Sequence, residues 1–391
     1  MQKPKDSRAT LARNATSAQG EKYVSKPGYH TTNVARPLNR IRIAHVISDS
    51  NIGGAGIYLL TYLKYHDAGK FDVFVVIPEN SKLEEEIRRL GVRVITIPQL
   101  AEKTFSWLAM SKLRKIFKRE KPQIVHCHAA LSARVAARLC RGIKIIYTRH
   151  TYIENAKRGG FVNNLLCDKV IAVSNAAAKN VGVTSKKVKV IYNGVTQVLH
   201  DDDEKKARMR VKYNIPEGMP VVGIVARLAK LKGHNVFIDA AEILNGKAEF
   251  IIAGAGEDGE ELKKYNEEKG CPARFIGFVN DVPGLMNILS VQVNATIGAE
   301  AASLSLMEGM SVGVPMVASD SGGNPELVIN GENGFIVPQG DGAALADKIR
   351  KLLDDKALYA EMSRKCESIY NDRFRADRMV TEMEQTYLQL V

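Results

Sequence analysis

The segment Thr296–Gly313 reads TIGAEAASLSLMEGMSVG and places two carboxylates, Glu300 and Glu308, among small and aliphatic residues. Either Ser303 or Ser305 can cap a helix with its hydroxyl, the residues that follow are mostly helix formers, and the closing glycine ends the helix. We therefore predict a short helix that contains Glu308, with Glu300 in the loop before it. The free N–H groups of such a helix start favour an anion, and carboxylates accept hydrogen bonds from hydroxyls. The segment predicts a pocket for an anion with hydroxyl groups on either side.

Two carboxylates are also what a glycoside hydrolase needs, so their spacing matters. Along a continuous helix, Glu300 and Glu308 would lie about 12 Å apart, whereas hydrolases need about 5 to 9.5 Å. The spacing therefore disfavours hydrolysis. The simpler alternative, that Glu308 is an exposed charge on an amphipathic helix, stays open at this point.

Length and composition describe an ordinary globular protein. The chain has 391 residues, of which 45% are hydrophobic and 25% charged, and this size is most simply divided into two domains. No apolar run approaches the roughly 20 residues of a membrane span, and the N-terminus lacks a hydrophobic signal segment, so we expect a cytoplasmic protein. The five cysteines never form a C-x-x-C pair, which predicts reduced thiols. We interpret His126, Cys127 and His128 as strand packing rather than as a metal site.

The formal net charge of +13 predicts a negatively charged partner. About half of the excess lies in residues 1–40, a polar lead that we expect to be disordered. Residues 106–121 predict a basic amphipathic helix, which can contact an anionic membrane or simply pack on a sheet with its lysines in water. No nucleic-acid-reading motif is present, so we expect no nucleic-acid partner.

The first half of the chain alternates predicted strands and helices. The strands are expected at 41–48, 71–77, 92–97, 124–127, 143–148, 169–173 and 188–192, with a helix from 57 to about 66. This alternation predicts a doubly wound parallel sheet, which binds ligands at the carboxyl ends of its strands. The glycine-rich turn 51–56 and His150 both lie at such ends.

The pattern restarts in the second half. We expect Asn193 and Gly194 to end the first unit and the charged segment 201–210 to be a solvated linker. A strand from Val221 then leads into a turn that Arg227 and Lys232 flank. An arginine and a lysine together suit a diphosphate, although one such pair in a loop is a weak signal.

A glycine motif at 254–259 imitates a dinucleotide-binding fingerprint. It follows the predicted strand 249–253, and Asp281 is expected to end the next strand, about where a ribose-binding acid would lie. Glu257 and Asp258, however, would place negative charge against a pyrophosphate, and the motif opens a middle unit of its sheet. We therefore reject a nicotinamide dehydrogenase. Further strands are expected at 275–279, 291–295 and 315–319, with helices at 285–289, 343–353 and 357–390.

From about residue 41 to its end, the chain resembles the retaining, nucleotide-sugar-dependent glycosyltransferases of family four, which have the GT-B fold. The matching pieces are the Gly53-Gly54 loop, TRH ending at His150, IYNGV at 191–195, RLAKLKG at 227–233, the Glu300/Glu308 pair and GGNPE at 322–326. The resemblance implies two Rossmann-like domains that face a cleft. We expect an acceptor-side domain at 41–194, a donor-binding domain at 195–370 and a C-terminal helix, 371–391, that packs back on the first domain.

The resemblance also implies roles for individual residues. Four would be catalytic: His150, Glu300, Arg227 and Lys232. The donor site would add Gly53, Gly54, Phe278, Val279, Leu304, Ser305 and Glu308. In this assignment Arg227 and Lys232 hold the donor diphosphate, Glu308 takes the ribose hydroxyls, and the backbone at 278–279 meets the base. No metal or other cofactor is expected.

The chain departs from the family pattern at Ala302-Ser303, where Phe-Gly is usual, which leaves the choice of donor sugar open. The implied partners are a nucleotide-sugar donor, preferably a UDP-sugar, and a lipid-linked or polysaccharide acceptor. Two other hypotheses remain: a nucleotide-sugar epimerase on the same fold, and a non-catalytic subunit that binds the sugar nucleotide without turning it over.

Overall fold

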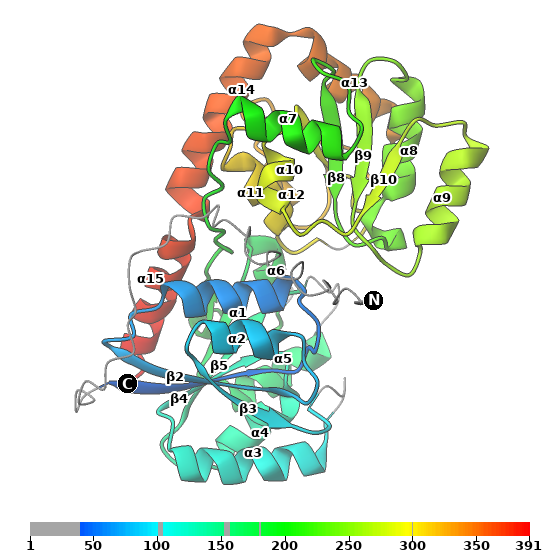
Figure 1. The fold of residues 1–391 in the computed structure, drawn as a ribbon. Coiled ribbons are helices and arrows are strands. Elements are labelled where there is room, and N and C mark those ends of the chain that lie inside the picture. Colours follow the sequence, from blue (N-terminus) through cyan, green and yellow to red (C-terminus); the bar gives the residue numbers. More distant parts are fainter. Residues whose placement is uncertain (1–39, 101–104, 152–156, 180, 299) are drawn as a thin grey trace, which may run out of the picture.

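The computed structural model describes residues 40–100, 105–151, 157–179, 181–298 and 300–391 (Figure 1). Residues 1–39 of the basic lead lie outside the described part. The remainder forms two α/β units, each built on one parallel sheet, as the alternating pattern predicts.

The N-terminal sheet has the strand order β3-β2-β1-β4-β5-β6-β7, and all of its pairings are parallel. Its strands are β1 (Ile41–Ile47), β2 (Phe71–Pro78), β3 (Arg93–Ile97), β4 (Ile124–His128), β5 (Lys144–Arg149), β6 (Lys169–Ala172) and β7 (Val188–Val190). The helices are α1 (Gly54–Tyr65), α2 (Leu83–Arg89), α3 (Trp107–Glu120), α4 (Leu131–Arg138), α5 (Lys157–Leu166) and α6 (Asn175–Lys179).

Both faces of this sheet are buried, which is why its strands are almost continuously apolar. On one face Ile43 and Ile47 pack with α1 and the C-terminal helix, and on the other Ala44 and Val46 pack with α3 and α4. The side chain of Cys127 belongs to this second face.

The second sheet has the order β10-β9-β8-β11-β12-β13. Its strands are β8 (Val221–Val225), β9 (Glu249–Ala253), β10 (Arg274–Gly277), β11 (Val291–Asn294), β12 (Met316–Ser319) and β13 (Gly334–Val337). The helices that follow the linker are α7 (Asp203–Lys212), α8 (His234–Ile243), α9 (Gly259–Glu268), α10 (Val282–Met286), α11 (Leu304–Met310), α12 (Asn324–Leu327), α13 (Gly342–Asp354), α14 (Lys356–Ile369) and α15 (Ala376–Leu388).

Two expectations about local structure are wrong. The charged segment 201–210 is not a solvated linker, because Asp202 caps α7 by accepting the N–H of Lys205 at 2.8 Å, and Asp201 is buried. Asp281 does not end a strand, since β10 stops at Gly277 and Asp281 caps α10 instead.

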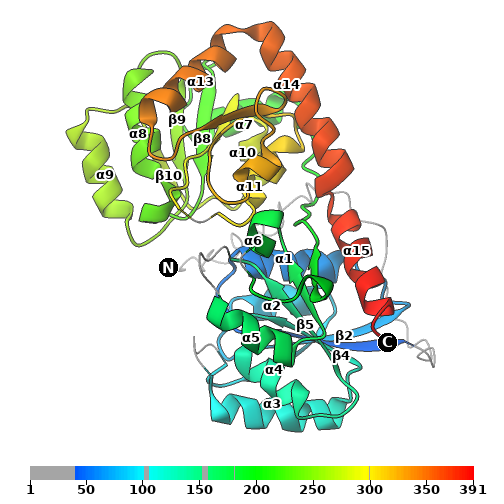
Figure 2. The same ribbon diagram turned by 180° about the vertical axis from the view of Figure 1, so that it is seen from behind.

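The region 357–390 is largely helical, as predicted, but it is not one uninterrupted helix. It is interrupted by a π-helical turn, Tyr370–Phe374, and by Arg375 in extended conformation. The reason is tertiary: the chain crosses between the domains here, and Val195, on the other crossing segment, pairs with Arg375. Beyond the break, α15 lies beside α1 on the N-terminal domain (Figure 2).

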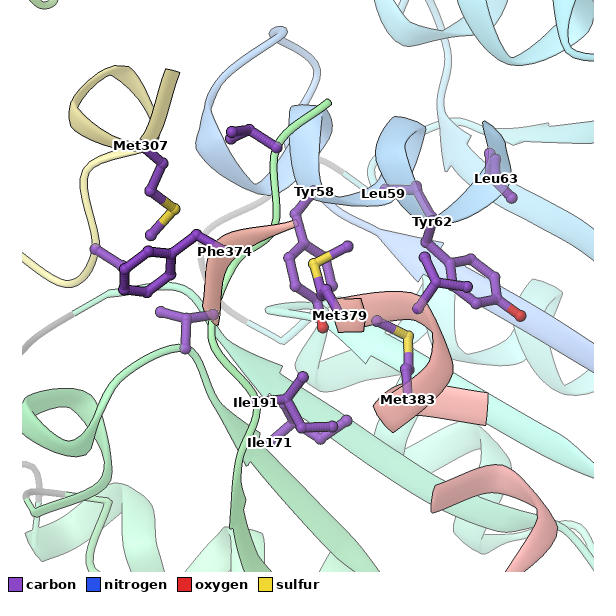
Figure 3. Packing of buried hydrophobic residues seen from close by; sticks show 14 of the residues in the cluster. Tyr58, Leu59, Tyr62, Leu63, Ile171, Ile191, Met307, Phe374, Met379 and Met383 are labelled. Atoms are coloured by element: carbon purple, nitrogen blue, oxygen red, sulfur yellow. The ribbon is translucent and has the colours of Figure 1, made fainter. Parts of the chain in front are cut away.

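An apolar cluster joins the two domains around this crossing (Figure 3). Phe374, Met379 and Met383 come from the C-terminal segment, Tyr58 and Tyr62 from α1, and Met307 from α11 of the second domain. All are buried. Burial of this kind, at roughly 25 cal/mol per Å² of apolar surface, is the main stabilisation of the interface.

A polar contact also joins the two domains at this interface. Glu326, from the GGNPE motif, accepts hydrogen bonds from the N–H groups of Asn175 (2.8 Å) and Ala176 (2.7 Å) and from the Tyr192 hydroxyl (2.7 Å). The Asn175 side chain donates as well, at 2.9 Å. One carboxylate of the second domain therefore caps α6 of the first.

We predict that Glu326→Gln loosens this contact, because the amide replaces one acceptor oxygen with a donor that faces other donors. The expected loss is about 2 kcal/mol in the free energy of unfolding, measured by urea denaturation. The control is Glu332→Gln, in an exposed turn, which should change little. Equal stability of the two variants would contradict the assigned role of Glu326.

Candidate active site

The turn after β8 and the loop after β11 meet through one ion pair. The Nζ of Lys232 lies 2.7 Å from Oε2 of Glu300. Gly233 makes this approach possible: its φ is +66°, and an added Cβ would lie 1.9 Å from the carbonyl oxygen of Ala295. Backbone contact between the two loops thus positions both charged side chains.

Glu300 is only 7% exposed, so its carboxylate needs partners. Its Oε2 accepts a hydrogen bond from the Thr296 hydroxyl at 3.3 Å and faces the Asn294 amide at 3.5 Å. Its Oε1 has no hydrogen-bond partner among the described residues. That oxygen is therefore available to a ligand hydroxyl.

The glycine motif at 254–259 packs against the same turn. A Cβ on Gly254 would lie 1.9 Å from the carbonyl oxygen of Ala226, and one on Gly256 would lie 2.1 Å from that of Leu228. Asp258 accepts the N–H of Lys230 at 2.7 Å. These glycines allow the backbone of the motif to lie against the backbone of the 226–228 turn. This packing explains why the motif resembles a dinucleotide-binding fingerprint.

Arg227 is exposed, and its guanidinium lies 3.7 Å from the Glu257 carboxylate. An exposed pair at this distance contributes at most about 1 kcal/mol. Arg227 can therefore leave Glu257 for a more highly charged anion at small cost.

Helix α11 begins where the sequence predicts. Ser303 is the N-cap and its hydroxyl accepts the N–H of Leu306 at 3.4 Å, so the departure from the family's Phe-Gly supplies the cap. The N–H groups of Leu304 and Ser305 have no acceptor among the described residues. Glu308 is in the helix, as predicted.

The Glu308 carboxylate has no hydrogen-bond or ion-pair partner in the described part of the chain. It is half-buried, and burial raises its pKa to about 7. An unpaired, partly desolvated carboxylate is suited to accept hydroxyl hydrogen bonds from a ligand.

Three of the predicted residues, Gly53, Gly54 and His150, belong to the N-terminal domain. Gly54 is the first residue of α1, and an added Cβ would lie 4.0 Å from the Leu304 side chain across the interface. Gly53 is the N-cap, with φ of −100°, and needs no left-handed conformation. His150 follows β5, and its ring packs on His128 and on the edge of Tyr58.

Phe278 and Val279 follow β10. Phe278 is 75% exposed whereas Val279 is buried. The carbonyl of Gly277 accepts the N–H of Gly254 at 2.8 Å, which ties this loop to the glycine motif beside Arg227. The structure thus brings the donor-side residues together through three adjoining loops.

Sequence reasoning missed Asn294 and Thr296, the side chains that hold Glu300. Only their position in the sequence could have indicated these two residues. Asn294 ends β11, and both residues lie at the carboxyl end of that strand, where parallel sheets bind ligands. It also missed the histidine cluster beneath His150. Nitrogens of His45, His126 and His128 lie within 4.8 Å of one another, a spacing that a metal ion can occupy, but they already bond to each other or to hydroxyl groups.

Two family models match this chain. Residues 52–197 match Glycosyltransferase Family 4, and residues 205–368 match Glycosyl transferases group 1. Together they cover both domains.

Curated relatives match over most of their length. The chain is 26% identical to the Escherichia coli UDP-Gal:alpha-D-GlcNAc-diphosphoundecaprenol alpha-1,3-galactosyltransferase, covering 90% of this chain and 98% of that protein. It is 24% identical to the Campylobacter jejuni N,N'-diacetylbacillosaminyl-diphospho-undecaprenol alpha-1,3-N-acetylgalactosaminyltransferase, covering 86% and 96%.

Solved structures share the fold. Anabaena HepE in complex with UDP and glucose superposes with a TM-score of 0.80 at 22% identity, covering 89% of this chain and 99% of that one. A Rickettsia africae glycosyltransferase gives 0.79 at 21%, covering 90% and 99%.

The raised pKa of Glu308 predicts a pH-dependent stability. Between about pH 4.5 and 7 the folded protein keeps a proton that the unfolded chain has lost, so the free energy of unfolding falls as pH rises through this window. The Glu308→Gln variant has no carboxyl group to titrate at this position, so its free energy of unfolding does not show this fall. We expect the variant to gain about 1 to 2 kcal/mol over the parent between pH 5 and pH 8, after allowance for partial exposure.

Urea denaturation at the two pH values measures this difference. The control is Glu361→Gln, an exposed glutamate on α14, which should follow the parent. A stability difference between Glu308→Gln and the parent that does not change with pH would contradict the desolvated carboxylate.

Proposed function

The chain belongs to the group 1, family four glycosyltransferases of the GT-B fold, and from this premise we propose that it transfers a sugar from a UDP-sugar, with retention at the anomeric carbon, to a lipid-linked or polysaccharide acceptor. The observation that carries the proposal is the Lys232–Glu300 ion pair beside the exposed Arg227. The ion pair places the Lys232 ammonium, which can bind a phosphate, next to the Glu300 carboxylate, which can accept a hydrogen bond from a hydroxyl.

The donor is held by the second domain. Arg227 and Lys232 neutralise the diphosphate as it leaves, in the manner of an oxyanion clamp. The free N–H groups of Leu304 and Ser305 lie on the phosphate side, and Glu308 accepts the ribose hydroxyls. The exposed ring of Phe278 and the backbone of Val279 meet the base.

The transfer proceeds by substitution on one face of the sugar. Glu300 is fixed by Lys232 and accepts a hydroxyl of the transferred sugar, so it is not free to act as a nucleophile. The leaving phosphate helps deprotonate the acceptor, and Gly53, Gly54 and His150 border the reacting sugar. Because two cationic side chains supply the charge, the reaction needs no divalent metal.

The two curated relatives are named for acceptors on diphosphoundecaprenol. These names support a lipid-linked acceptor, and we propose that the protein acts at the cytoplasmic face of a membrane. None of the described helices combines the length and apolar character needed to cross a bilayer. Contact with the membrane is assigned to α3, whose inner face packs on α4 and whose Trp107 is 74% exposed beside a run of lysines and arginines.

The first test is a thermal-shift screen of UDP, GDP, ADP and their common sugars. A ligand at 100 times its Kd stabilises by about 2.7 kcal/mol. For the nucleotide that binds, its acceptor-dependent release is then measured with lipid extract. Stabilisation by UDP with release supports the transferase; interconversion of donors without acceptor supports the epimerase; binding without turnover supports the non-catalytic subunit.

Removing the phosphate-binding cation separates these outcomes further. We expect Lys232→Ala to lower kcat/KM for sugar transfer by about 10²- to 10³-fold, because the leaving diphosphate loses its counter-charge. The control, Lys247→Ala, removes an exposed ion pair to Asp354 and should retain activity. Losses of only a few-fold in both Lys232→Ala and Glu300→Ala would refute the assignment.

Membrane contact is tested by flotation with anionic vesicles. Lys115→Glu with Lys118→Glu, on the exposed face of α3, should weaken binding at least about tenfold, since each lysine near an anionic surface is worth about 1 kcal/mol. The matched control reverses Lys263 and Lys264 on α9. Equal flotation of both variants would refute the role of α3.

A further inference from the structure

Four histidines meet beneath the candidate active site. His45 comes from β1, His126 and His128 from β4, and His150 follows β5. His45 is directly opposite His126 in the parallel pairing of β1 with β4. His45, His126 and His128 are fully buried on the sheet face that α15 covers.

A continuous chain of hydrogen bonds links these rings to the C-terminal helix. The first part of the chain joins His150 Nε2 to His128 Nδ1 (2.9 Å) and His128 Nε2 to His45 Nδ1 (3.1 Å). The Tyr387 hydroxyl comes next, and it contacts both His45 Nε2 (3.4 Å) and His126 Nδ1 (2.6 Å). The chain ends where His126 Nε2 meets Thr148 Oγ1 (2.6 Å). Among the described residues, the Nδ1 of His150 has no partner.

The rings are neutral, because burial holds the pKa values of His45 and His150 at about 3 and lowers those of His126 and His128 well below the usual range. A neutral imidazole has one N–H and one lone pair, so each ring donates once and accepts once. The run of three imidazoles from His150 through His128 to His45 therefore has only two consistent directions, and the direction decides which nitrogen of His150 carries the proton.

The Tyr387 hydroxyl selects between these directions. Its contact with His126 is short, as expected when a phenol O–H donates, and its contact with His45 is long. The phenol oxygen then accepts from His45 Nε2–H, which leaves His45 Nδ1 to accept from His128 and His128 Nδ1 to accept from His150. The Nδ1 of His150, which has no partner among the described residues, then carries a lone pair.

We propose that Tyr387, acting through His45 and His128, fixes His150 in its Nε2–H tautomer, so that Nδ1 accepts a hydrogen bond from a hydroxyl of the bound sugar. The identity of that ligand rests on the proposed function. Tyr387, His45 and His128 are positioning residues, since none touches the ligand. Because α15 supplies Tyr387, the site on the first domain is complete only when this helix is docked.

Docking of α15 is itself specified by polar contacts. The carboxylate of Glu384 accepts the N–H of Asp67 at 2.7 Å, and the ammonium of Lys189 donates to the Thr386 hydroxyl at 2.9 Å. Tyr62 packs edge-on against the Tyr387 ring. The hydroxyl of Tyr387 is therefore held at one position relative to the two histidines it contacts.

The tautomer is measured directly by two-bond ¹H–¹⁵N spectra of full-length protein labelled on histidine. We expect His150, assigned with a His150→Gln variant, to give the Nε2–H pattern. Tyr387→Phe removes only the hydroxyl and should convert this signal to a mixture of tautomers. It should also lower kcat for sugar transfer about 3- to 10-fold while leaving the Kd for the stabilising nucleotide unchanged.

The matched control is Tyr370→Phe, which removes another buried hydroxyl from the C-terminal segment, one that donates to the carbonyl of Val195 at 3.0 Å. It should lose stability but keep the His150 signal.

An Nδ1–H pattern or a charged ring in the parent protein would overturn the proposal, as would an unchanged His150 signal in Tyr387→Phe. Zinc found bound to the purified protein, with the His45 and His128 signals shifted by it, would also overturn it. If Tyr387→Phe fails to fold, the spectrum of the parent still decides. The spectra do not depend on turnover, so failure of the transferase assignment is distinguishable.

Discussion

The contact between Lys232 and Glu300 is the interaction on which the candidate site depends. A carboxylate buried this deeply is tolerated only with a counter-ion and hydrogen bonds, and here one ammonium, one hydroxyl and one amide converge on a single oxygen. Close packing of the surrounding backbone also holds these groups in place. Gly233 lies against the strand end before Glu300, and Gly322 lies against the carbonyl of Glu300 itself, where any side chain would collide at 2.0 Å. The motifs that look separate in the sequence are thus parts of one tightly packed arrangement.

The double crossing between the domains has a comparable role for the first half of the site. The chain passes from the first domain to the second at Val195 and returns at Arg375, and these residues pair with each other. Gly194 is required there, because an added Cβ would lie 2.5 Å from the carbonyl oxygen of Arg375. The return segment places α15 on the sheet face that carries the histidines. A helix at the far end of the sequence therefore completes the polar interior of the N-terminal domain.

The fold and the donor-side loops could be predicted from sequence because their signals are local. Alternation of strands and helices gave both sheets, and a serine before helix formers gave the start of α11. The errors arose where tertiary contacts decide. Residues 203–212 form a helix although they are highly charged, and the helix expected over 357–390 breaks where the domains cross. The histidines were individually uninformative: only strand register shows that His45 and His126 are neighbours, and nothing local connects either to Tyr387.

The two domains present different electrostatic characters to the proposed donor, one positive and one neutral. On the second domain Arg227 and Lys232 supply positive charge, which the departing diphosphate requires. On the first domain the four clustered histidines, His45, His126, His128 and His150, are kept neutral by burial, and among the described residues every ring nitrogen of the four except Nδ1 of His150 has a partner. A protonated His150 would repel the positive charge that develops at an anomeric carbon as its phosphate departs. A neutral ring orders a hydroxyl without that penalty. In the proposed mechanism, the second domain therefore stabilises the leaving anion, whereas the histidines of the first domain remain uncharged beside the reacting carbon.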